Sequence, residues 1–151
     1  MTAMTTEPGG RRVEHQVVVG VDGSESSKAA LAWAIRQARL TGAVVLAVTA
    51  WAFPDEYGYP VIMPTLDWKR LATQVVTAAI SEVGQGDVPV RYEVVRGNAA
   101  RALIAASAGA DLLVVGTRGH GGLVEALLGS TGQHCVRYAT CPVVVVRDAG
   151  H

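Results

Sequence analysis

The sequence predicts a doubly wound α/β domain, in which helices cover both faces of a five-stranded parallel sheet. Short valine-rich segments alternate with segments of helical periodicity along the chain, as expected for repeated strand–helix units. The continuous apolar runs LLVV at 112–115 and VVVV at 143–146 are typical of strands that are buried on both faces. Crossover helices bury the strands of a parallel sheet in this way, so these observations together predict the fold class.

Five segments have the length and composition of strands. Each is rich in apolar or β-branched residues and is shorter than a typical helix. They are residues 15–21, 43–50, 88–95, 112–116 and 142–147. A longer connection at 51–65 contains three prolines, Pro54, Pro60 and Pro64, so we expect it to be irregular and to lie over a site.

Segments of helical periodicity lie between these strands. Apolar residues three and four apart share a helix face in three groups: Leu31, Ile35 and Ala38; Leu71, Val75 and Ala78; Leu103 and Ala106. Residues that favour helix ends support these assignments. The expected N-caps are Ser24, Asn98, and Ser130 or Thr131, and glycines 42 and 109 follow expected C-termini.

Length and composition indicate one domain. The 151 residues are 50% hydrophobic and 17% charged, enough apolar material for a single core. We expect this domain to span 13–148, after a disordered polar tail at 1–12. Lys plus Arg and Asp plus Glu number 13 each, so the chain lacks the positive field expected of nucleic-acid or membrane binding. No apolar run reaches membrane-spanning length, and we expect a soluble protein.

The two cysteines, Cys135 and Cys141, do not have the CxxC spacing of a redox or zinc site. They are also too few for the disulfide scaffold of a small secreted protein. We therefore expect buried, inert thiols and a reducing, cytoplasmic location. His15 and His134 have no metal-ligand spacing with each other or with a carboxylate pair, so no metal site within the protein is expected.

Glycine-rich loops follow the first and fourth predicted strands. They read GVDGS at 20–24 and GTRGHGG at 116–122, and GSTG at 129–132 opens the next helix. Ligands of open α/β sheets bind at the carboxyl ends of strands, where loops and helix N-termini present backbone N–H groups. Glycines permit close backbone approach and hydroxyls add donors, so these loops predict a phosphate cradle. A flexible surface turn is the alternative.

The spacing of these glycines resembles a known family. The GxxxxGK[ST] loop and a GxGxxG after the first strand are both absent, whereas Gly116, Gly119, Gly129 and Ser130 fit G-x2-G-x9-G-[ST]. This pattern resembles the ATP-binding subgroup of the universal stress protein family. The segments VVVGVDGSESSKAAL, ADLLVVGTRGHGG and CPVVVVR also resemble it, along nearly the whole chain apart from the tail, with a departure at Gly132. The resemblance implies a Rossmann-like fold of the nucleotide-α-hydrolase type.

The resemblance also implies a ligand, ATP with Mg²⁺ or a related adenine nucleotide. It places Val21 and Asp22 at the nucleotide, with Asp22 at the ribose hydroxyls or Mg²⁺, and Val48 at adenine through its backbone. The phosphate loop would comprise Gly116, Arg118, Gly119, His120, Gly129, Ser130 and Thr131. On the residues alone, Asp22 also suits an Asx turn with Gly23, and Val48 also suits the core. Arg118 and His120 also suit solvated surface positions.

Three functions are compatible with these residues. The first, which the family resemblance implies, is a regulatory module whose nucleotide state tunes association with an unidentified protein during stress or low energy. The resemblance also implies a homodimer through the edge strand at 142–147. No nucleophile with a paired base can be assigned, so any hydrolysis would be slow. The second is an adenylating or slowly ATP-hydrolysing enzyme of this fold, although VDGSES replaces the SGGxDS loop of such enzymes. The third is a nucleotide-free interaction domain, against which the intact glycines argue.

Overall fold

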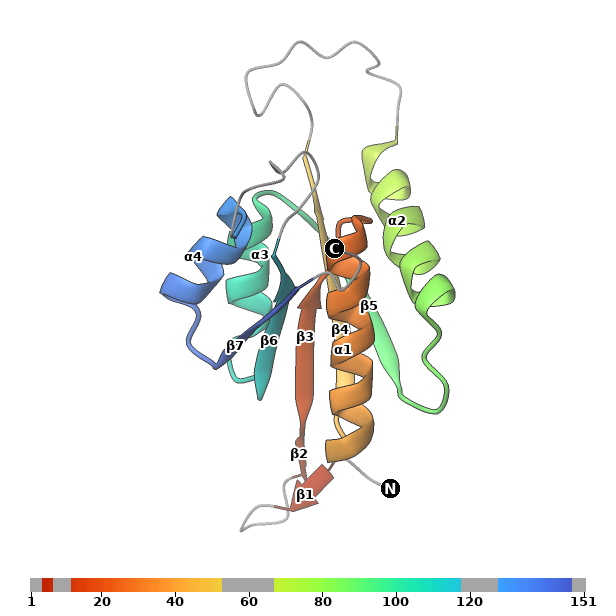
Figure 1. Ribbon diagram of the computed structural model, residues 1–151, viewed down its shortest axis with the longest axis vertical. Helices are drawn as coiled ribbons and strands as arrows, with labels where there is room; N and C mark the ends of the chain where they lie inside the picture. The colour runs from red at the N-terminus through yellow and green to blue at the C-terminus, as the bar shows by residue number, and fades with distance from the viewer. Residues whose placement is uncertain (1–3, 7–11, 53–66, 118–127, 148–151) are drawn as a thin grey trace.

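Five parallel strands form one sheet in a computed structural model, which describes residues 4–6, 12–52, 67–117 and 128–147. The strands are β3 (Gln16–Gly20), β4 (Val44–Trp51), β5 (Val90–Arg96), β6 (Leu112–Gly116) and β7 (Val143–Val146), in the spatial order β5-β4-β3-β6-β7 (Figure 1). All five predicted strand segments are confirmed, with ends that differ by at most two residues. In the described residues, no helix is both long and apolar enough to cross a membrane.

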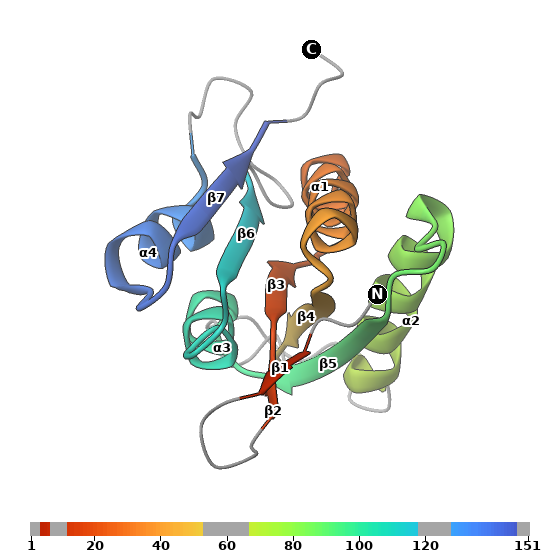
Figure 2. The same ribbon diagram turned by 90° about the horizontal axis from the view of Figure 1, so that it is seen from below.

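Helices cover both faces of this sheet. They are α1 (Glu25–Thr41), α2 (Trp68–Val83), α3 (Ala99–Ala106) and α4 (Ser130–Tyr138). Helices α1 and α2 lie on one face, and α3 and α4 lie on the other (Figure 2). This arrangement confirms the predicted doubly wound fold.

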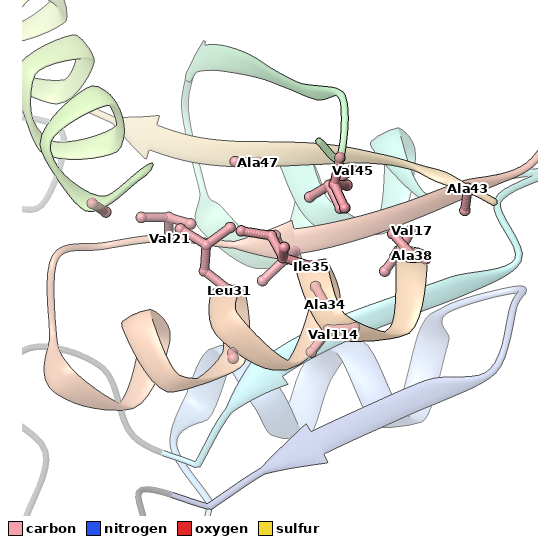
Figure 3. Packing of buried hydrophobic residues seen from close by; sticks show 14 of the residues in the cluster. Val17, Val21, Leu31, Ala34, Ile35, Ala38, Ala43, Val45, Ala47 and Val114 are labelled. Atoms are coloured by element: carbon pink, nitrogen blue, oxygen red, sulfur yellow. The ribbon is translucent and has the colours of Figure 1, made fainter. Parts of the chain in front are cut away.

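Alternate residues of each strand belong to two separate core clusters, because successive side chains of a strand point to opposite faces of the sheet. Val17, Val19 and Val45 pack with Leu31 and Ile35 of α1 in the first cluster (Figure 3). In the second cluster, on the face of α3 and α4, the buried residues include Val18, Leu46, Leu103, Leu113 and Cys135. The predicted apolar faces of α1 and α3 are thus confirmed.

The apolar face predicted for α2 is wrong by one position. The residues buried against the sheet are Ala72, Val76 and Ala79, whereas Leu71 is 38% exposed. Two apolar series of helical spacing run side by side in this helix. Packing against the sheet selects the series that contains Ala72, Val76 and Ala79.

Side chains cap three of the four helices in the described part of the chain. The predicted caps Ser24 and Asn98 each accept a hydrogen bond from the backbone N–H three residues on, at 3.1 Å in both cases. Asp67 caps α2 in the same way at 3.0 Å, which the sequence analysis did not predict. The cap predicted for α4 at Ser130 or Thr131 is wrong, since the N-cap is Gly129 and both hydroxyl residues lie inside the first turn.

Two short strands lie near the N-terminus. β1 (Met4–Thr6) pairs antiparallel with β2 (Arg12–Glu14). The disorder expected over residues 1–12 stays a prediction. The boundary of the domain at residue 13 stays a prediction. Of the long connection expected at 51–65, Trp51 belongs to β4 and residues 53–65 lie outside the described residues.

Candidate site at the carboxyl ends of β3 and β6

The two glycine-rich loops lie at the point where the strand order reverses. From β3 the chain winds outward to β4 and β5, then returns to β6 beside β3 and continues to β7. The helices that follow β3 and β6 therefore leave the sheet toward opposite faces (Figure 2). Ligands of open α/β sheets bind at such a switch point, outside the carboxyl ends of the two strands.

Asp22 forms a tight turn at the end of β3. Its Oδ1 accepts a hydrogen bond from the Ser24 N–H at 2.9 Å, which is the geometry of an Asx turn, and Gly23 between them has φ of 86°. The Asp22 N–H in turn donates to Ser27 Oγ at 3.3 Å. The turn considered as an alternative for Asp22 is therefore present, and its contact with a ligand stays a prediction.

Val21 and Val48 are joined where β3 ends. The Val21 N–H donates to the Val48 carbonyl at 2.9 Å, and the Thr49 hydroxyl donates to the Val21 carbonyl at 2.7 Å. Both valines are buried, so Val48 has the core role that the sequence also allowed, and its contact with adenine stays a prediction. Thr49 is a positioning residue that sequence reasoning missed; its signal was a hydroxyl in an otherwise apolar buried strand.

Gly116 allows α1 to approach the end of β6. A Cβ built at Gly116 would lie 2.7 Å from both the backbone carbon and the backbone oxygen of Ser26, a distance that real Cβ atoms do not adopt. The first glycine of the motif therefore has a packing role, which its spacing in the sequence did not indicate. It brings the first turn of α1 beside the loop that follows β6.

Thr117 connects three elements around this point. Its N–H donates to Val146 of β7 at 3.1 Å, and its carbonyl accepts from the Gly129 N–H at 2.7 Å. Its hydroxyl lies 3.4 Å from that of Ser26 in α1. The bond to Gly129 holds the two ends of the 118–128 segment together, so Thr117 and Ser26 position the site although sequence analysis selected neither.

The N-terminus of α4 differs from those of α1, α2 and α3 because no side chain of the described residues caps it. Gly129 occupies the N-cap position with φ of −68° and ψ of 169°, and the first turn contains no acidic residue. Ser130 is exposed and Thr131 is half-buried. The backbone N–H groups of a first helical turn have no partner within the helix, and the helix dipole places partial positive charge there. This end of α4 is suited to an anion.

The remaining motif residues divide into two groups. Arg118, Gly119 and His120 lie outside the described residues. Gly132, where the sequence departs from the family pattern, is buried, and a Cβ there would lie 2.6 Å from Leu128 Cδ1. The departure therefore accommodates the Leu128 side chain.

The two thiols belong to the second core cluster. Cys135 is fully buried in the second core cluster, and Cys141 packs against the same cluster. Burial raises the pKa of the Cys135 thiol from 9.0 to about 11, and the charge of Cys141 adds to the rise. A thiol with a raised pKa is a poor nucleophile at neutral pH. The described residues contain no group of three metal-ligating side chains.

The universal stress protein family model matches residues 14–147, and that match spans most of the chain. The chain belongs to the universal stress protein family. A universal stress protein of Mycobacterium tuberculosis strain H37Rv is 36% identical over 138 residues, which are 88% of this chain and 45% of the relative. This chain thus spans about half the length of the first curated relatives. A universal stress protein of Thermus aquaticus is 35% identical over 137 residues, 87% of this chain and 97% of the relative.

Solved structures of universal stress proteins share the fold. One, in complex with cAMP, is 30% identical with a TM-score of 0.59, covering 90% of this chain and 98% of that chain. Another, from Archaeoglobus fulgidus in complex with dAMP, is 20% identical with a TM-score of 0.65, covering 88% and 98%. These proteins bind adenine nucleotides on the same α/β fold.

Proposed function

We propose that this universal stress protein is a regulatory module that binds ATP at the carboxyl ends of β3 and β6. The observation that carries the proposal is the N-terminus of α4, which has no side-chain cap among the described residues and which the hydrogen bond from Gly129 to Thr117 holds at the switch point. The complex of a 30% identical relative with cAMP supports an adenine nucleotide as the ligand class. Occupancy of the site by nucleotide would tune the association of this protein with a cytoplasmic protein partner.

The residues present suit the phosphates. The N–H groups of Ser130 and Thr131 open a helix without a side-chain cap, and both residues carry hydroxyl donors. Gly129 has no side chain to stand between these donors and an anion. An anion at this position gains both hydrogen bonds and the favourable end of the helix dipole.

A magnesium ion would bind at the same place only together with the phosphates. Mg²⁺ keeps several waters and typically binds one or two carboxylates together with phosphate oxygens. Asp22 provides a carboxylate at the end of β3, in a turn whose geometry is already set by the Ser24 N–H. When bound, the ion would screen phosphate charge beside this carboxylate.

The proposal includes a homodimer through β7. This strand is the last in the sheet order, pairs with β6 on one side, and consists of four valines. A second copy related by two-fold symmetry would satisfy the outward backbone groups of both chains. The opposite edge strand, β5, carries exposed Arg91, Glu93 and Arg96, and charged side chains discourage such pairing.

Identification of the bound nucleotide tests the proposal directly. Small molecules released from the purified protein are identified by mass spectrometry, and calorimetry then compares ATP, ADP, AMP and cAMP, with GTP as the control for the base. We expect saturable ATP binding in the presence of Mg²⁺. A protein that releases no nucleotide and produces no binding heat with any of them would contradict the proposal and favour a nucleotide-free interaction domain.

A further inference from the structure

Buried hydroxyl groups gather at the carboxyl edge of the sheet. The buried polar residues in the described part of the chain are Ser26, Ser27, Thr49 and Ser107. The first two lie in the first turn of α1 and the third lies near the end of β4, whereas Ser107 follows α3 and precedes β6 at the opposite edge. Burial of a hydroxyl is unfavourable unless it forms a hydrogen bond, so the bonds of these hydroxyls indicate what they hold in place.

The peptide unit between Val21 and Asp22 is held at both ends. The Thr49 hydroxyl donates to the Val21 carbonyl at 2.7 Å, and the Asp22 N–H donates to Ser27 Oγ at 3.3 Å. The carbonyl and the N–H of a trans peptide point in opposite directions within one rigid plane. Side chains of β4 and α1 therefore fix the orientation of this peptide from its two sides, where β3 turns toward α1 (Figure 3).

The carboxylate of Asp22 depends on the same network. Its Oδ1 accepts from the Ser24 N–H at 2.9 Å. Ser24 is bonded in turn to Ser27, whose hydroxyl donates to the Ser24 carbonyl at 3.0 Å and whose N–H donates to Ser24 Oγ at 3.1 Å. Rotation of the Val21–Asp22 peptide would change the direction of the Asp22 side chain, because both are attached to the same Cα atom. The bonds from Thr49 and Ser27 therefore hold the carboxylate at the switch point, outside the end of β3.

We propose that Thr49 controls nucleotide affinity through Asp22, because its hydroxyl sets the peptide orientation on which the direction of the carboxylate depends. This inference rests on the proposed function. Thr49 is 5% exposed and its hydroxyl is bonded to Val21, so it acts through the peptide and not by contact with the ligand. Valine has nearly the same shape but lacks the donor, so the Val21 carbonyl would lose a hydrogen bond. Packing alone therefore does not require threonine at this position.

Calorimetry with MgATP on variants of Thr49 tests this role. Thr49→Val removes the hydroxyl, and we expect MgATP to bind about tenfold more weakly. Thr49→Ser retains the hydroxyl and should bind as the parent protein does. A loss of affinity in Thr49→Ser equal to that in Thr49→Val would assign the effect to packing and overturn the proposal.

Ser107→Ala is the matched control for the loss of a buried hydroxyl. The Ser107 hydroxyl donates to the Ile104 carbonyl at 3.2 Å, at the opposite edge of the sheet. The variant should lower the free energy of unfolding in urea but leave MgATP binding unchanged. If Ser107→Ala weakens MgATP binding as much as Thr49→Val does, a general loss of stability is the cause and the proposal fails.

A double-mutant cycle with Asp22 distinguishes positioning from a structural role. Asp22→Asn keeps the acceptor for the Ser24 N–H but removes the charge, so we expect MgATP to bind about tenfold more weakly. The effects of residues that act through one contact are not additive, so Thr49→Val should weaken binding by less than about twofold in the Asp22→Asn background. A loss of about one hundredfold in the double variant would show that the two residues act independently, which overturns the proposal.

A second variant and the parent protein separate this inference from the proposed function. If Thr49→Val does not fold, Ser27→Ala releases the other end of the peptide and should behave in the same way in the cycle. A parent protein that binds no nucleotide contradicts the proposed function itself. If the parent binds MgATP, and either Asp22→Asn alone or both Thr49→Val and Ser27→Ala bind it equally well, only the control of affinity by Thr49 is overturned.

Discussion

At the residue scale, the absence of a side chain explains why a glycine, Gly129, occupies the N-cap position of α4. The φ of Gly129 is −68°, a value that every residue adopts, so the backbone conformation does not require glycine at this position. Ser, Thr, Asn or Asp at an N-cap would bond the helix's own N–H groups. Glycine leaves those groups for an exogenous anion.

Gly129→Asp should therefore separate ligand binding from stability. The new carboxylate would cap α4 and repel phosphate, so we expect ATP affinity to fall at least tenfold, about 1.4 kcal/mol. The free energy of unfolding should remain equal or rise by a few tenths of a kcal/mol. Calorimetry and urea unfolding measure the two quantities. Thr140→Asp adds the same charge at an exposed position beyond α4 and should bind ATP normally; equal binding by both variants would exclude this helix terminus as the phosphate site.

Gly116 has a different role, which Gly116→Ala tests. Its Cβ would meet the backbone of Ser26 at 2.7 Å, so α1 must shift, and we expect a loss of about 1–3 kcal/mol in urea unfolding. Gly20→Ala is a graded comparison, because its Cβ would meet the Leu103 side chain at 2.8 Å, and a side chain can rotate away. An equal loss in both variants would show that the close approach of α1 to β6 is not the cause.

The raised pKa of Cys135 predicts a loss of stability at alkaline pH. Between pH 9.0 and about 11 the thiol of the unfolded chain loses its proton while the buried thiol retains it. The unfolded state then binds fewer protons, so the free energy of unfolding falls as pH rises, by up to about 2–3 kcal/mol over two pH units.

Deprotonation of Lys28 also lowers the free energy of unfolding, but at higher pH. Hydrogen bonds to Glu25 and Glu82 raise its pKa above 10.5, so its contribution is lost only above that value. Urea unfolding between pH 9 and 10 therefore isolates the thiol. Cys135→Ala should flatten the dependence in this interval, and an unchanged slope would assign it to other groups.

At the element scale, the backbone groups of β7 differ in whether they face β6 or the outer edge of the sheet. In β7 the carbonyls of Pro142 and Val146 accept from Leu113 and Thr117 at 2.9 and 3.1 Å. The backbone N–H and C=O groups of successive residues point to alternate sides of a strand. Those of Val144 therefore also point toward β6, whereas those of Val143 and Val145 point outward, away from the sheet. The edge position of β7 alone suggests Val144→Pro as a change that would disrupt the dimer. This substitution would instead break a hydrogen bond between β6 and β7.

Val145→Pro should therefore abolish the dimer and leave the monomer folded, since it removes an outward N–H. Val144→Pro should lower the free energy of unfolding because it removes a donor within the sheet. Light scattering and circular dichroism distinguish these outcomes. A parent protein that is monomeric at working concentrations, or a dimer that persists with Val145→Pro, would show that copies do not pair through this edge.

At the scale of the whole molecule, the sequence predicted what depends on local pattern. Strand segments, the parallel sheet and the caps Ser24 and Asn98 follow from periodicity and from the chemistry of adjacent residues. The contacts of Thr117 and Ser26 do not, because they join residues 91 positions apart and arise only when β6 lies beside β3. The buried face of α2 was also beyond prediction, since two apolar series competed and the packed sheet selected one.

This dispersion of the site along the chain predicts how nucleotide affects the whole molecule. Asp22, Thr117 and Gly129 come together only in the folded sheet, so the unfolded chain should have no affinity for ATP. A ligand that binds only the native state stabilises it by about 2.7 kcal/mol at one hundred times its dissociation constant. For a chain of this size that corresponds to a rise of about 5–10 °C in the melting temperature. Scanning calorimetry with and without MgATP measures the shift. Gly129→Asp, with at least tenfold weaker affinity, should show a rise at most about half as large at the same ATP concentration. If ATP binds the parent by calorimetry but does not raise its melting temperature, the unfolded chain binds ATP as well, and the site does not depend on the assembly of the sheet.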